Sequence, residues 1–119
     1  MSEQERAGMA ETSAAPSVEE LYETSFQIIA AAGSAKSSYL EALAAAKQGN
    51  AEAAQRAIIE GDDAAAMGHE AHAELIRREA EGSPIQMNFI LTHAEDQLLG
   101  AELVKILALE LIELYEARN

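Results

Sequence analysis

Two clusters of helix-breaking residues, Gly49-Asn50 and Gly82-Ser83-Pro84, divide this chain into three long segments. Glycine readily adopts the left-handed conformation that closes a helix, and proline fits the first turn of the helix that follows. We therefore expect helices roughly over residues 17–49, 51–80 and 85–118. Three long helices joined by two short loops predict an all-α, up-down-up antiparallel bundle.

The composition agrees with a helical fold. Alanine and leucine supply most of the 49% hydrophobic content, and only 4% of the residues are aromatic. A chain of 119 residues is long enough for one domain with its own core. Residues 1–16 lack an apolar period, so we expect a disordered lead-in there and a helical domain over residues 17–119. The absence of cysteine excludes disulfides, thiolate catalysis and cysteine metal sites.

The charge of the chain disfavours two classes of partner. Its 21 acidic and 8 basic residues give a net charge of −13, which repels phosphate backbones and anionic lipid headgroups. No apolar run approaches the roughly 20 residues that span a bilayer, and the first residues lack a signal-peptide pattern. We expect a cytoplasmic protein that neither binds nucleic acid nor inserts into a membrane.

The third segment is more apolar than a lone three-helix bundle requires. One seam with alternating four- and three-residue spacing contains Phe89, His93, Asp96, Gly100, Leu103, Leu107 and Leu114. Other faces of the same helix contain Leu98, Val104, Ile106, Leu109, Leu111 and Ile112. A helix that is apolar on more than one face implies a second interface, so we predict a homo-oligomer.

The first half of this seam contains two polar residues that can carry chemistry. His93 and Asp96 are three residues apart and share a helix face. If the seam lies on a symmetry axis, the copies of Asp96 meet in a dry core, where mutual repulsion and desolvation both oppose ionisation. Such a ring needs protons or a cation, and a hard divalent ion such as Mg²⁺ accepts oxygen ligands.

Several segments resemble a known family. They are the stretch from Gly33 to Gly49 with its Ala46-Lys47-Gln48-Gly49 ending, His69, Leu75-Ile76, and His93-Ala94-Glu95-Asp96 followed by the leucine-rich helix to Glu116. Over about residues 17–118 the chain resembles the lactose/cellobiose-type enzyme IIA components of the bacterial phosphoenolpyruvate-dependent sugar phosphotransferase system. The resemblance covers nearly the whole expected domain.

This resemblance implies a homotrimer, a nine-helix bundle of three-helix chains. Members of the family relay a phosphoryl group from the histidine-containing phosphocarrier protein to a cysteine of the sugar-specific IIB component. His93 occupies the position of the phosphorylated histidine. Asp96 occupies the position of the aspartate that gathers with its two symmetry copies around one buried metal ion, for which we expect Mg²⁺.

The chain also departs from the family pattern near the predicted site. Glu95 stands where the pattern has glutamine, Gln97 replaces a second histidine, and His72 replaces another glutamine. We expect supporting roles for these three residues and for His69, where the family also has a histidine. A carboxylate at Glu95 should repel an incoming phosphoryl group unless it points away or is paired.

Other interpretations of the same residues remain open. A lone histidine in a helix is more often structural than nucleophilic, and an aspartate at a seam can act as a register device. His69 and His72, with Glu70 and Glu74 nearby, form only a weak metal-site pattern. The rival functions are a non-catalytic helical oligomerisation or regulatory protein, and a metal-storage or sensor bundle that uses all three histidines.

Overall fold

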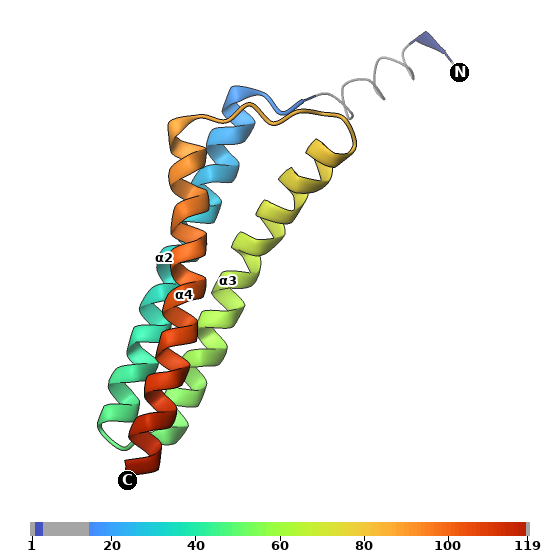
Figure 1. Cartoon of the computed structure of the whole chain (residues 1–119). Coiled ribbons are helices and arrows are strands. Elements are labelled where there is room, and N and C mark those ends of the chain that lie inside the picture. Colours follow the sequence, from blue (N-terminus) through green and yellow to red (C-terminus); the bar gives the residue numbers. More distant parts are fainter. Residues whose placement is uncertain (1, 4–14, 119) are drawn as a thin grey trace.

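The computed structural model describes residues 2–3 and 15–118 and shows three long helices (Figure 1). They are α2 (Val18–Lys47), α3 (Ala51–Ala80) and α4 (Phe89–Arg118). Within the described ranges no residue is in a strand, so the all-α prediction is confirmed. Most of the lead-in predicted over residues 1–16 lies outside the described residues.

The first two helices begin and end close to where the sequence predicted. Ser17 caps α2, because its Oγ accepts a hydrogen bond of 3.1 Å from the backbone N–H of Glu20. Gly49 has a φ of 78°, the left-handed conformation expected after a helix end. Asn50 then caps α3 by accepting a 3.1 Å bond from the N–H of Ala53.

The predicted start of the third helix at about Ile85 was wrong. The helix begins at Phe89, and Asn88 caps it. Oδ1 of Asn88 accepts a hydrogen bond of 2.8 Å from the backbone N–H of Leu91, and the backbone carbonyl of Asn88 accepts one of 2.9 Å from the backbone N–H of Thr92. Pro84 therefore lies outside the helix. The asparagine side chain satisfies a free amide of the first turn, which a proline cannot do.

The three helices do not pack equally. Helix α2 contacts both α3 and α4 along the bundle, whereas α3 and α4 touch at few points. Figure 1 shows α3 leaning away from α4 towards the end that contains Ala80. The central core cluster is rich in alanine, whose small side chain lets helices approach closely: Ala32, Ala35, Tyr39, Ala65, Ala101 and Ala108. A groove between α3 and α4 follows from this arrangement.

Gly61 permits the close approach of α3 to Tyr39. A Cβ added at Gly61 would lie 2.5 Å from a ring carbon of Tyr39, whose side chain is only 2% exposed. We expect Gly61→Ala to lower the free energy of unfolding by about 1–3 kcal/mol, because the overpacked ring must shift. This expected loss is what remains after the gain of about 1 kcal/mol in helix propensity, which offsets part of the packing cost.

Urea denaturation measures the effect of Gly61→Ala. The matched control is Gly33→Ala on α2, where an added Cβ meets nothing within 4 Å. The control should unfold at the same or a higher urea concentration than the wild type. Equal stability of the two variants would contradict the packing argument.

Candidate functional site

Helix α4 has two different stripes. The buried stripe packs inside the chain and consists of Leu91, Ala94, Leu98, Ala101, Ala108 and Ile112. His93 and Asp96 lie on the opposite stripe and are exposed. Large apolar residues of that outer stripe are also exposed: Phe89 by 86%, Leu103 by 56%, Leu107 by 53% and Leu114 by 57%. The chain thus leaves an apolar helix face uncovered around His93 and Asp96.

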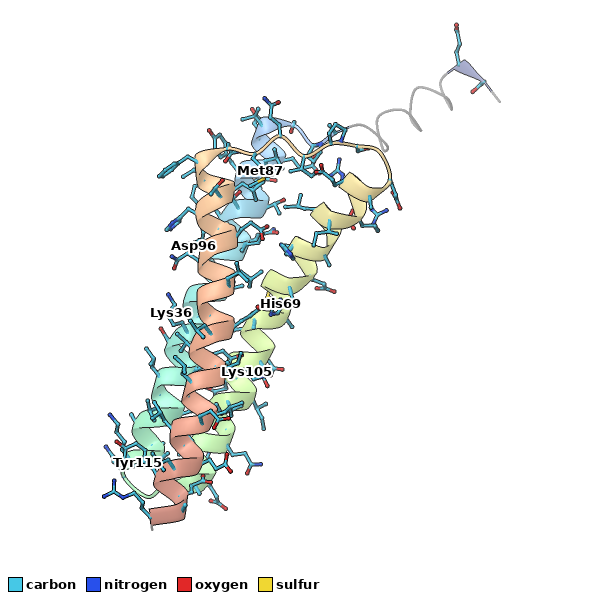
Figure 2. The ribbon with its side chains drawn as sticks, in the orientation of Figure 1. Lys36, His69, Met87, Asp96, Lys105 and Tyr115 are labelled. Carbon is cyan, nitrogen blue, oxygen red and sulfur yellow. The ribbon has the colours of Figure 1, made fainter. Side chains whose placement is uncertain are left out.

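Gln97 lies at the border between this outer stripe and α2. It is four residues after His93 and therefore on the same side of the helix. Its Oε1 accepts a hydrogen bond of 3.3 Å from Nζ of Lys36 on α2. Figure 2 shows Lys36 and Asp96 on the side of α4 that faces away from α3. The structure brings His93, Asp96 and Gln97 onto one side, as their spacing predicted.

Lys36 is a residue that the sequence interpretation missed. It belongs to a stripe on α2 with the same four- and three-residue spacing, in which it is the charged member: Tyr22, Phe26, Ile29, Gly33, Lys36 and Leu40. A single lysine within an otherwise uncharged stripe was the sequence signal that could have identified Lys36 as a functional residue.

Glu95 is paired and directed away from His93. It comes two residues after His93, about 200° around the helix, so the two side chains do not face each other. Its Oε2 lies 2.5 Å from Nδ1 of His72 on α3. The two groups are within ion-pair distance, but their geometry is not that of a hydrogen bond. Glu95 therefore places no free carboxylate beside His93.

His69 also lies on the α3 side. Its Nδ1 is 3.3 Å from Oε1 of Glu102, and Figure 2 shows it on α3. Within one subunit the predicted site residues thus form two groups. His93, Asp96 and Gln97 lie on the outer side of α4, whereas His69, His72 and Glu95 line the groove between α3 and α4.

Two cavities occupy this groove. The cavity near the cap of α4 has a volume of about 370 Å³ and is lined by His72, Leu75, Ile76, Glu79, Ala80, Ile85, Met87, Leu91 and Glu95. The other has a volume of about 530 Å³ and lies farther along α4, beside His69, Glu102 and Lys105. The three cross-helix pairs from α3 to α4 border these cavities.

A hydrogen-bonded network joins all three helices at the larger cavity. The O–H of Tyr39 donates to Oδ1 of Asp62 at 2.7 Å, and Nζ of Lys105 lies 2.8 Å from the same oxygen. Burial, the hydrogen bond to Asp62 and the charge of Asp62 all raise the pKa of Tyr39. Partial burial opposes ionisation of Asp62, but the hydrogen bonds from Lys105 and Tyr39 prevail and lower its pKa.

This network predicts a pH-dependent contribution to stability. The folded-state pKa of Asp62 lies below the ordinary value of 3.8. The ionised carboxylate therefore stabilises the fold above about pH 3.8, and this stabilisation is lost as the pH falls through the folded-state pKa. Asp62→Asn should cost about 0.5–1 kcal/mol at neutral pH, a small value because the side chain is 43% exposed. Urea denaturation should show the difference from wild type shrinking below about pH 4. A difference that grows on acidification would contradict this assignment.

The described part of one chain does not assemble a metal site from its own residues. Among residues 2–3 and 15–118, no three histidine, cysteine, aspartate or glutamate side chains are placed to hold an ion together. The three-histidine site of a storage or sensor bundle is therefore not formed within the described part of a subunit. Asp96 offers one oxygen-donor group on the outer stripe of α4.

The fold and the outer stripe define a class of protein: a three-helix subunit that exposes a histidine and a carboxylate on an uncovered helix face. Residues 23–116 match the sequence profile described as "PTS system, Lactose/Cellobiose specific IIA subunit". The chain belongs to this family of the sugar phosphotransferase system.

Individual relatives agree with the family match. The chain is 42% identical over 98 residues to the lichenan-specific phosphotransferase enzyme IIA component of Bacillus subtilis, covering 82% of this chain and 89% of the relative. It is 40% identical over 91 residues to the lactose-specific EIIA component of Streptococcus mutans, covering 76% and 88%. The crystal structure of the cellobiose-specific enzyme IIA from Bacillus anthracis superposes with a TM-score of 0.79 at 37% identity, covering 86% of this chain and 92% of that one.

The family match makes the chain a component of a sugar phosphotransferase system, and so implies phosphoryl transfer linked to sugar uptake. None of the described helices is both long and apolar enough to cross a membrane.

Proposed function

We propose that this chain is a phosphocarrier subunit in which His93 accepts a phosphoryl group from the histidine-containing phosphocarrier protein and passes it to a cysteine of the sugar-specific IIB component. The observation that carries this proposal is the position of His93 on the outer stripe of α4, where it is exposed in the single chain. In the trimer proposed below, His93 opens toward a cleft between subunits, where a partner protein can reach it, while Asp96 turns to the axis. The match to the family over residues 23–116 includes this position.

The chemistry suits an imidazole. A ring nitrogen of His93 attacks phosphorus while the bond from phosphorus to the donor's histidine nitrogen breaks, and the donor nitrogen keeps the electron pair. The resulting phosphoramidate retains a high transfer potential. In the second step the IIB thiolate attacks phosphorus, the bond to His93 breaks, and its nitrogen recovers the electron pair. In-line positioning contributes more to such transfers than covalent assistance.

The proposal includes a homotrimer with Asp96 on its axis. The outer stripe of α4 is apolar at Leu103, Leu107 and Leu114, and copies of the chain can cover it. Asp96 would then hold one Mg²⁺ with its two symmetry copies. Carboxylate oxygens are the ligands that this ion prefers, so the available donor fits it. The ion would neutralise the repulsion among the carboxylates and has no part in the phosphoryl transfer.

Replacing Asp96 by leucine tests the metal site. We expect the Asp96→Leu variant to remain a trimer and to lose its bound metal, because an apolar side chain removes the repulsion that the ion offsets. Metal analysis and sedimentation equilibrium on the same sample measure both properties. Dissociation of the leucine variant into monomers, or retention of metal, would contradict the proposed role.

The cellular setting follows from the same role. We place the chain in the cytoplasm, with the phosphocarrier protein and the IIB component as its partners and with no contact to nucleic acid. The names of its relatives mention lichenan, lactose and cellobiose, so we propose a β-linked sugar as the transported substrate.

Phosphorylation in a reconstituted system tests the function. The chain is incubated with phosphoenolpyruvate, enzyme I and the phosphocarrier protein, and its intact mass is measured. We expect a mass increase of one phosphoryl group that is stable in base and labile in acid. The absence of such an adduct would overturn the phosphocarrier proposal in favour of a non-catalytic oligomerisation protein.

A further inference from the structure

Lys36 has an unusual partner for a cation in so acidic a chain. Its Nζ donates to the neutral side-chain carbonyl of Gln97 at 3.3 Å. Among the residues that the structure describes, Lys36 has no carboxylate within ion-pair distance, whereas Lys105 pairs with Asp62 and Arg77 with Glu74. The positive charge of Lys36 is therefore not neutralised by a partner within the described chain. It lies on the side of the bundle that also contains Asp96 (Figure 2).

The contact also fixes the orientation of the Gln97 amide. An ammonium group can only donate hydrogen bonds, so the atom that faces Lys36 must be the carbonyl oxygen Oε1. The amide nitrogen Nε2, with its two hydrogens, then points to the other side of the amide group. Without Lys36 the amide could turn over and present its oxygen in that direction. An oxygen there would repel a phosphoryl group rather than bind it.

The geometry brings this amide towards His93. Gln97 is one helical turn after His93 on the same side of α4. Helical side chains slant towards the N-terminal end of their helix, so Gln97 extends from its own turn towards that of His93. Helix α2 runs in the same direction as α4 in the up-down-up bundle (Figure 1). By the same rule, the stem of Lys36 should slant towards the same end of the bundle.

We propose that Lys36 is a positioning residue for phosphoryl transfer: it orients Gln97 so that the amide donates to the phosphoryl oxygens on His93, and its charge stabilises the dianion. This inference rests on the proposed role of His93. A phosphoryl dianion bound to a chain with a net charge of −13 requires a local source of positive charge. Lys36 supplies that charge without losing it to a carboxylate.

The experiment compares Lys36→Met with the wild type in the reconstituted phosphorylation assay. We expect the first-order rate of phosphoryl acceptance, at saturating phosphocarrier protein, to fall about tenfold, as for the loss of one charge-assisted hydrogen bond. The KM for the phosphocarrier protein should change much less. Lys36→Arg should restore most of the rate, because guanidinium also donates without accepting.

Two further variants make the test specific. Gln97→Leu should slow acceptance by a similar factor. The double variant with Lys36→Met should be slower than either single variant, but by less than the product of the two factors, because the two residues share the amide while Lys36 also contributes its charge. Lys47→Met removes a lysine from the last turn of the same helix and serves as the matched control with an unchanged rate. Thermal unfolding of Lys36→Met should match that of the wild type.

The outcomes separate this inference from the proposed function. An acid-labile adduct on the wild type together with a wild-type rate for Lys36→Met would overturn the role of Lys36 alone. Fully additive effects of Lys36→Met and Gln97→Leu would overturn the orientation of the amide by Lys36. Failure of the wild type to form any adduct would overturn the proposed function, whatever the variants show.

Discussion

The His93→Gln variant is expected to form no phosphoryl adduct at all. Glutamine keeps much of the size and polarity of histidine, but its amide nitrogen shares its lone pair with the carbonyl group and cannot attack phosphorus. The loss should be complete rather than partial, because the other two histidines lie in the groove between α3 and α4 and not on the outer stripe. Intact mass after incubation with phosphoenolpyruvate, enzyme I and the phosphocarrier protein gives the result directly.

The other two histidines provide the controls for this experiment. The chain has three histidines, and His69 and His72 lie beside carboxylates in the groove between α3 and α4. His69→Gln and His72→Gln should both still form the adduct. The fold should be unaffected by His93→Gln, since an exposed side chain changes stability by about 0.5 kcal/mol or less. An adduct on His93→Gln, or its absence from either control, would assign the acceptor to a different residue.

Leu107→Glu is expected to convert the proposed trimer into single chains. The side chain of Leu107 is 53% exposed in the subunit and lies in the middle of the outer stripe of α4. In an assembly across this stripe, the substitution places a carboxylate from every subunit in one apolar interface, at a cost of several kcal/mol. Sedimentation equilibrium should show the mass falling from three chains to one chain of 12.7 kDa.

The matched control for Leu107→Glu is Ile59→Glu. Ile59 on α3 is 55% exposed, nearly the same fraction as Leu107, but it lies outside the outer stripe of α4. This control should remain an oligomer. If Leu107→Glu keeps the wild-type mass, or if Ile59→Glu dissociates equally, the subunits do not assemble through the outer stripe.

The sequence predicted those parts of the fold that depend on local chemistry. Ser17, Gly49 and Asn50 end or begin helices through their own backbone and side-chain preferences, and the structure confirms them. The start of α4 was misplaced because Pro84 and Asn88 both suit a helix start, and their order of preference depends on how the chain crosses the end of the bundle. Local patterns do not contain that information.

The candidate site divides in the same way. The common face of His93, Asp96 and Gln97 follows from helical spacing alone, so it could be predicted. The contact between Lys36 and Gln97 joins residues 61 positions apart and depends on how α2 packs against α4. The pairing of Glu95 with His72 likewise depends on the approach of α3 to α4. Such contacts between helices require the structure.

One contact joins His72 and Glu95, the residues at two positions where we expect the chain to depart from the family pattern. Nδ1 of His72 is shielded from solvent and makes no aligned hydrogen bond, so the Glu95 carboxylate 2.5 Å away is the group that offsets its burial, and removing Glu95 alone would take that group away. Removing His72 alone would leave a carboxylate at the edge of an apolar cavity. We therefore expect the two positions to be energetically coupled: replacing both residues together should cost less stability than the sum of the two single replacements.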